Sequence, residues 1–115
     1  MYTDLLLYRN ELKIKSVPKY KIIGITAQLL FSKKIFYRNC EIDKFLKELL
    51  EVEFKSYVLR SRTLIVAKTC KLIDNMDSYS NYQKKLHKFV CEKIEQLQKD
   101  NDLKEQKNEF DRWID

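Results

Sequence analysis

The sequence predicts an all-α protein, folded as a single compact bundle of about five helices over residues 1–115. The chain has 115 residues, of which 44% are hydrophobic and 12% aromatic, enough for one core but too few for two ordinary domains. It contains one glycine and one proline, whereas a β-sheet protein needs turn residues about every 8 to 12 positions. Two short runs rich in β-branched residues, 21–25 and 64–67, leave a strand as the alternative in those places.

The first two helices are predicted on either side of a break around Pro18. Residues 3–13 form the first, with Asp4 in its first turn, where the helix dipole favours a negative charge. Proline is tolerated in the first turn of a helix, so the second helix is expected over residues 18–31. This second helix is apolar on most of its circumference, which predicts that it is buried. Residues 32–38 are expected to form a short helical turn or an irregular link.

The strongest amphipathic pattern in the chain predicts a helix over residues 40–51, with Asn39 as its N-cap. The apolar residues of this helix recur at helical spacing: Ile42, Phe45, Leu46, Leu49 and Leu50. After a looser stretch at residues 52–56, apolar side chains again cover most of a long segment, residues 57–73. We expect this segment to be the buried central helix of the bundle.

The C-terminal third is predicted to be helical and highly charged. Turn-forming residues fill positions 75–81, and Ser80 with Gln83 matches a capping box, so a long helix is expected to start there. A second match to the capping box, at Asp102 and Glu105, indicates a further helix start.

Residues 99–115 are therefore predicted to be a separate terminal helix or a helix that projects from the body. Phe110, Trp113 and Ile114 are spaced so that they form one apolar stripe. Such a stripe either docks onto the body or binds another chain. These three side chains are the candidate partner-binding residues, for a protein partner or a second copy of this chain.

Several features bear on the compartment. The longest apolar runs are four residues, whereas a membrane-spanning helix needs roughly 20. The N-terminal residues lack the pattern of a signal peptide. Cys40, Cys70 and Cys91 are odd in number and match neither a disulfide framework nor a zinc site, so they are expected to be free thiols. The sequence predicts a cytoplasmic protein with no membrane partner, and its lysine-rich, alanine-poor composition is typical of an AT-rich bacterium or phage.

Charge is distributed unevenly along the chain. The net charge is +6, with 23 basic and 17 acidic residues. Residues 12–40 contain seven cations and no acid, and residues 54–73 contain five cations and no acid. The remainder of the chain therefore carries a net charge of −6. Two basic segments, rather than the whole surface, are candidates for an acidic partner.

Nucleic acid is the partner that this charge distribution favours. The long segment 57–73 carries a polar stripe of cations and small residues, which is suited to a phosphate backbone or a major groove. The outline of residues 39–73 resembles a helix-turn-helix or a helix, extended loop and helix, although it lacks the usual glycine-containing turn. The alternative without a function is that this stripe is only the solvent-exposed face of a helix in a lysine-rich protein. The candidate nucleic-acid-binding residues are Lys33, Lys34, Arg38, Arg60, Arg62, Thr63, Lys68 and Lys71.

No pattern in the sequence indicates catalysis. His87 is the single histidine and has no recognisable partner for acid–base chemistry. The acidic clusters lack the spacing of a two-metal site, and no glycine-rich phosphate loop or hydrolase motif is present. The sequence therefore predicts a protein that is not an enzyme and that uses no metal or cofactor.

The predicted function is that of a small regulatory or accessory protein that binds nucleic acid through its basic helical surface. The alternative is a protein–protein adaptor or inhibitor that docks through its C-terminal helix. A subunit of a larger nucleoprotein complex would combine both functions. The leading prediction requires the two basic segments, distant in sequence, to meet on one face of the bundle.

Overall fold

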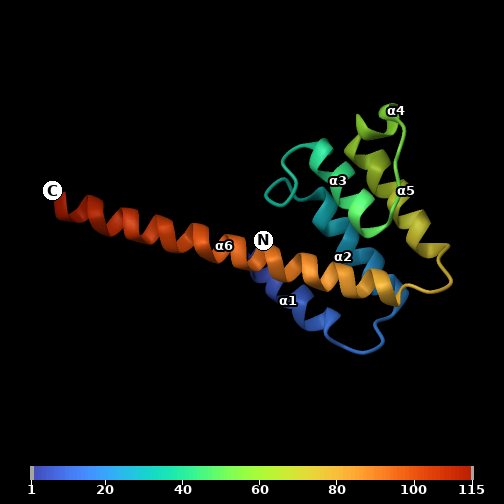
Figure 1. The fold of residues 1–115 in the computed structure, drawn as a ribbon, viewed down its shortest axis with the longest axis horizontal. Helices are drawn as coiled ribbons and strands as arrows, with labels where there is room; N and C mark the ends of the chain where they lie inside the picture. The colour runs from blue at the N-terminus through green and yellow to red at the C-terminus, as the bar shows by residue number, and fades with distance from the viewer. Residues whose placement is uncertain (1, 115) are drawn as a thin grey trace.

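The computed structural model describes the backbone of residues 2–114 and the side chains of residues 2–100. Within residues 2–114 the chain forms helices and no strand (Figure 1). The predicted all-α bundle is thus confirmed, with six helices in this range instead of about five. The strand alternatives are wrong, because residues 21–25 and 64–67 lie inside helices. In chain order the helices are α1 (Tyr2–Leu12), α2 (Lys19–Phe31), α3 (Asn39–Leu49), α4 (Ser56–Leu59), α5 (Arg62–Asp74) and α6 (Ser80–Ile114).

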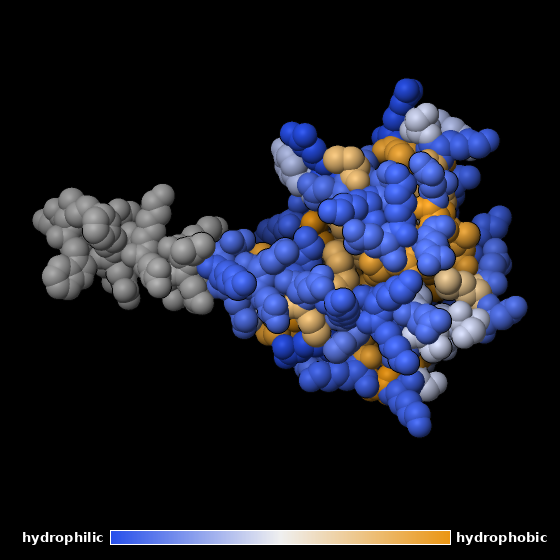
Figure 2. All heavy atoms as spheres, in the orientation of Figure 1, coloured by the Kyte–Doolittle hydropathy of each residue, from blue (hydrophilic) through white to orange (hydrophobic). Residues whose placement is uncertain are grey.

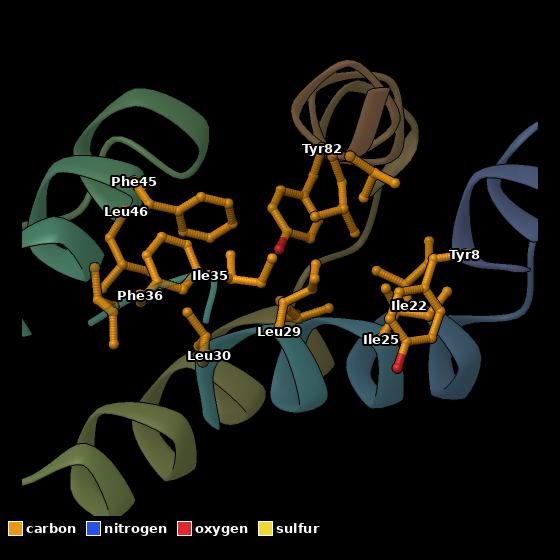
Figure 3. Close-up of a cluster of buried hydrophobic side chains, with 14 of the residues drawn as sticks. Tyr8, Ile22, Ile25, Leu29, Leu30, Ile35, Phe36, Phe45, Leu46 and Tyr82 are labelled. Carbon is orange, nitrogen blue, oxygen red and sulfur yellow. The ribbon is translucent and has the colours of Figure 1, made fainter. Parts of the chain in front are cut away.

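Helix α2 is the buried central helix. It packs against α5 in antiparallel fashion, because Arg62 at the start of α5 donates a hydrogen bond to the Leu30 carbonyl, while Lys19 at the start of α2 donates to the Asp74 carbonyl. On its other side, the hydroxyl groups of Thr26 and of Tyr82 in α6 are 2.8 Å apart and share a buried hydrogen bond. Figure 3 shows α2 running beneath α6, with its leucine and isoleucine side chains filling the space between them.

Helices α1 and α6 pack along each other and close the other side of the core. Their buried side chains, Leu5, Tyr8, Leu12, Leu86, Val90 and Ile94, recur at helical spacing. The buried Gln83 side chain donates hydrogen bonds to the carbonyls of Leu12, at 3.1 Å, and Ile14, at 2.8 Å. Gln83 therefore ties the start of α6 to the end of α1, a tertiary role that the capping-box pattern did not predict.

The segment 57–73 is not the single long helix that the sequence predicted. It is divided into α4 and α5 at Arg60 and Ser61. Ser61 has an extended backbone conformation and is the N-cap of α5, with its Oγ accepting a hydrogen bond from the Leu64 amide at 3.3 Å. Serine side chains bond to nearby backbone amides in this way, and here that local preference outweighs the continuous apolar pattern.

Helix α3 ends two residues earlier than predicted. Its C-terminal turn is closed by Glu51, whose φ of 55° places it in the left-handed region. The Val52 amide then donates to the Leu46 carbonyl at 3.4 Å, which turns the chain back toward the end of α3. Residues 51–55 that follow are not helical and lead into α4.

Helix α6 begins at Ser80 as predicted. Of the two alternatives predicted for the C-terminal segment, a separate helix and a projecting helix, the first is wrong, because the backbone has no break near Asp102. The backbone continues as one helix of 35 residues, and Figure 1 shows its C-terminal part extending beyond the other helices. The side chains of Phe110, Trp113 and Ile114 lie outside the described side chains, so their docking stays a prediction. No helix in the described part of the chain is long and apolar enough to cross a membrane. Hydrophilic residues cover most of the face of the body seen in Figure 2, with hydrophobic residues visible between them.

Candidate nucleic-acid interface

A cluster of hydrogen bonds around Arg62 joins four parts of the chain. The Arg62 guanidinium donates through Nε to Asn39 Oδ1 at 2.9 Å and through Nη1 to the Leu30 carbonyl at 3.0 Å. The Asn39 side chain in turn donates through Nδ2 to the Leu59 carbonyl at 2.8 Å. This Arg62–Asn39 cluster connects the end of α2, the start of α3, the end of α4 and the start of α5.

The Arg62–Asn39 cluster brings the two basic segments together. Arg38 precedes Asn39, and Arg60 follows Leu59, so each arginine is one residue from the same hydrogen bond. Consecutive Cα atoms are about 3.8 Å apart, which keeps the two backbones close. Figure 1 shows the connection between α2 and α3 in the same upper part of the body as α4, away from the α1–α2 connection. We call the four exposed cations here the basic end: Lys33, Lys34, Arg38 and Arg60.

The cations of the basic end have no partner among the side chains of residues 2–100. No ion pair or side-chain hydrogen bond joins any of the four to another described residue. The acid closest to them in the sequence is Glu41, whose Oε2 accepts a hydrogen bond from the Tyr37 amide at 3.2 Å. Unpaired cations with little neutralising charge produce a positive potential that attracts an anionic partner.

The outer face of α5 matches the predicted polar stripe in part. Thr63, Ala67 and Lys71 are exposed at four-residue intervals, as expected for one helix face. Lys71 lies nine residues beyond Arg62, or about 14 Å along the helix axis. Lys68 is half-buried, with its Nζ 5.9 Å from the centre of the Tyr57 ring. Lys68 and Lys71 therefore extend the stripe away from the basic end.

Arg62 occupies a different place from the other candidate residues. Two of its guanidinium nitrogens are engaged by Asn39 and Leu30, and its side chain is half-buried. These hydrogen bonds give Arg62 a structural role, because they join the segments that carry Arg38 and Arg60. The sequence could not distinguish this role, because the acceptors lie 23 and 32 residues away.

The first basic segment is split between the two ends of α2. Lys19 donates to the carbonyls of Asp74, at 3.0 Å, and Met76, at 2.7 Å, and Lys21 forms an ion pair with Glu11 at 3.8 Å. Lys13 and Lys15 precede α2 and lie at the same end as Lys19. Only the last three cations of this segment reach the basic end.

A third acid-free stretch, outside the two predicted basic segments, lies between Asp77 and Glu92. It contains Lys84, Lys85 and Lys88, all exposed on the first turns of α6. Lys84 lines a shallow groove of about 350 Å³ whose lining residues are Leu12, Lys13, Ile14, Lys15, Gln83, Lys84 and His87. The two predicted basic segments were identified as stretches that contain cations and no acidic residue. The same criterion applied to the whole sequence identifies this third stretch.

The predicted free thiols are confirmed for Cys40, Cys70 and Cys91. Burial raises the pKa of the Cys70 thiol, which keeps it protonated at neutral pH. The Cys91 sulfur is 3.7 Å from Nε2 of His87, one helical turn earlier. The described residues hold no group of three or more histidine, cysteine or acidic side chains placed to bind a metal ion.

The fold and the site together define an all-α bundle with unpaired cations gathered at one end. Comparison of the chain with protein-family models, with curated proteins and with solved structures gives no match. Its function is therefore inferred from the geometry and charge of its own residues.

Proposed function

We propose that this protein binds nucleic acid through the basic end. The observation that carries the proposal is the Arg62–Asn39 cluster, which joins the backbone segments that carry the exposed Arg38 and Arg60, although these residues are 22 positions apart in the chain. A rigid arrangement of unpaired cations favours a polyanion over a small anion, because several phosphates are neutralised at once.

The contacts in this proposal are made mainly to the phosphate backbone. Lys33, Lys34, Arg38 and Arg60 neutralise phosphates, and the exposed hydroxyl of Thr63 adds a neutral hydrogen bond. Lys68 and Lys71 lengthen the contact along α5. Binding of this kind is largely independent of base sequence and suits a regulatory or accessory protein of the cytoplasm.

A salt titration with charge-reversal variants tests the proposal. The affinity of the full chain for a fluorescent oligonucleotide is measured by anisotropy at several salt concentrations. With four neutralised phosphates, log K against log salt should fall with a slope of about −3.6 on duplex DNA and about −2.8 on a single strand. Further phosphates at Lys68 and Lys71 would steepen the slope, and six contacts give a loss of about three decades or more between 50 and 200 mM salt.

The double variant Arg38→Glu with Arg60→Glu should lower the affinity. It should also make the slope of log K against log salt shallower by the contribution of about two phosphate contacts. Its matched control is Lys13→Glu with Lys15→Glu, which makes the same charge change at the other end of α2. If the two double variants lose equal affinity, binding depends on net charge alone and the proposed site is wrong. Absence of a salt slope, or of any binding below micromolar concentrations at low salt, refutes the function itself.

The adaptor function remains the second candidate, because α6 continues as one helix to Ile114. The variant Phe110→Ala with Trp113→Ala removes most of the apolar stripe that this function requires. Nucleic-acid affinity should stay unchanged in this variant if the basic end is the binding site. A loss equal to that of the Arg38 and Arg60 variant would instead place the terminal helix in the interface.

A further inference from the structure

Three large aromatic side chains are exposed at the basic end. Phe31 is 51% exposed, Tyr37 72% and Tyr57 56%. Phe31 follows Leu30, the carbonyl of which accepts from Arg62, and Tyr37 precedes Arg38. Tyr57 lies on α4, two residues before the Leu59 carbonyl that accepts from Asn39. The Arg62–Asn39 cluster therefore brings the backbone segments that carry these rings close to those that carry the cations, and the Tyr57 ring itself lies 5.9 Å from Lys68 Nζ.

The exposure of Tyr37 is set by the packing of its neighbour. Phe36 is only 3% exposed, and its ring lies 5.3 Å from that of Phe45 and 5.6 Å from that of Phe89, measured between centroids. Figure 3 shows Phe36 and Phe45 turned into the core. The Tyr37 amide is also fixed, since it donates to Glu41 Oε2. With Phe36 anchored inward and the backbone held, the Tyr37 ring is kept in solvent next to Arg38.

Exposed aromatic rings beside unpaired cations are suited to single-stranded nucleic acid, which offers both free base faces and phosphates. We infer that the basic end binds single-stranded nucleic acid, with unpaired bases stacking on Tyr37 and the cations following the phosphates, an inference that rests on the proposed function. In a duplex each base face is covered by its neighbours, so a protruding ring has nothing to stack on. Unpaired bases offer free faces, and stacking on aromatic side chains is a general mode of single-strand recognition.

The outer face of α5 supports the same choice. A helix that reads a duplex in the major groove presents long polar side chains to the base edges. Here the exposed positions of α5 before Lys71 are Thr63 and Ala67, which are too short to reach far into a groove. The rings and the cations are instead concentrated at the helix ends and in the connection between α2 and α3.

Charge identifies the partner as anionic rather than as an apolar protein surface. Exposed aromatic groups alone mark a contact site of any kind. At the basic end they alternate with cations, since Phe31 and Tyr37 flank Lys33 and Lys34 and Arg38 follows. A partner must therefore offer flat apolar faces and negative charges in alternation, which a single strand does.

The test compares three ligands of equal length at one salt concentration. These are a single-stranded oligonucleotide, the duplex of the same sequence, and an abasic strand that keeps the sugar–phosphate backbone but has no bases. The full chain should bind the single strand about 5- to 150-fold more tightly than the abasic strand for one stacked base, the range that corresponds to 1–3 kcal/mol. DNA and RNA versions of the strand show which sugar the site prefers, and preference for either over its abasic form supports the inference.

Variants of exposed tyrosines locate the stacking ring. Tyr37→Leu should remove most of the preference for the single strand over the abasic strand, and Tyr37→Phe should keep it, because the ring and not the hydroxyl stacks. The matched control is Tyr20→Leu, since Tyr20 is 76% exposed at the opposite end of α2. Neither position is buried, so these substitutions should leave the fold intact.

The outcomes separate this inference from the proposed function. Equal affinity for all three ligands, unchanged in Tyr37→Leu, overturns the stacking inference while salt-dependent phosphate binding stands. A loss in Tyr20→Leu as large as that in Tyr37→Leu also overturns it, because the effect would not be local. Failure of the full chain to bind any of the three ligands refutes the proposed function as well.

Discussion

The two ends of the α2–α5 pair both contain several cations but use them differently. At the end where α2 begins, Lys19 donates hydrogen bonds to two carbonyls, one in the last residue of α5 and one just after it. Lys21 there forms an ion pair with Glu11. At the basic end, one arginine, Arg62, makes the structural contacts, and the four cations around it are exposed and unpaired within the described part of the chain.

The difference shows that a cation's role depends on which backbone carbonyls remain free nearby. The end of a helix leaves carbonyls without partners, and a lysine or arginine that reaches them is also favoured by the helix dipole. Lys19 satisfies this need at the end of α5, and Arg62 satisfies it at the end of α2. The cations left over at each end are the ones available to a partner.

The largest effect should come from removing Arg62. Arg62→Ala leaves the Leu30 carbonyl and Asn39 Oδ1 without their donor, so the free energy of unfolding should fall by about 2–3 kcal/mol. Nucleic-acid affinity should fall too, because Arg38 and Arg60 are no longer held together. Urea denaturation and the anisotropy assay measure the two effects. An unchanged affinity in a folded Arg62→Ala protein would show that the basic end needs no support.

Alkaline pH should test the middle of α2, independently of both ends. Burial raises the pKa of the Tyr82 hydroxyl well above its usual range, and the hydrogen bond with Thr26 offsets part of this rise. Below about pH 10 the hydroxyl is protonated in both the folded and the unfolded chain. Above that pH only the unfolded chain ionises, so the free energy of unfolding should fall by about 1.4 kcal/mol per pH unit through this group.

The variant Tyr82→Phe isolates this contribution. At neutral pH it should lose about 1 kcal/mol, because the hydrogen bond with Thr26 is removed. Its decline in stability above pH 10 should be shallower than that of the unchanged protein, as measured by chemical denaturation at each pH. Parallel declines in the two proteins would mean that Tyr82 ionises normally in the folded state.

A smaller effect is expected at the end where α2 begins. Lys19→Met keeps most of the aliphatic side chain but removes the donor to the carbonyls of Asp74 and Met76, and it should cost about 1 kcal/mol. Its affinity for nucleic acid should not change, in contrast to Arg62→Ala. Lys13→Met is the control for loss of charge, since Lys13 is exposed before α2. Should Lys19→Met weaken nucleic-acid binding as much as Arg62→Ala, the contrast between the two ends would be lost.

Much of the fold was predictable because the signals are local. The scarcity of glycine and proline and the spacing of apolar residues indicated the helical bundle, and Ser80 marked the start of α6. The division at Ser61 was missed because serine is also compatible with a helix surface, and only its bond to the Leu64 amide reveals the cap. The end of α3 at Glu51 was missed because glutamate is a rare residue at a left-handed position.

The candidate site was predictable as a set of residues but not as an arrangement. Acid-free segments identified Lys33, Lys34, Arg38 and Arg60 from the sequence alone. The structural role of Arg62 depends on backbone carbonyls far away in the chain, and no spacing rule locates them. The exposed rings could not be predicted either. Phe36 and Tyr37 are adjacent aromatic residues, and only the structure shows which of them is buried.

The left-handed backbone conformation of Glu51 means that the stability of this fold can be raised by substitution. A glutamate pays a steric cost at a φ of 55° that glycine does not, while Gly24 lies inside α2, where added methyl carbon would meet no atom within 4 Å. Glu51→Gly and Gly24→Ala should therefore each raise the melting temperature, and Gly24→Ala is worth about 1 kcal/mol. Combining the two substitutions would give a more stable scaffold, able to tolerate destabilising changes at the basic end during directed evolution.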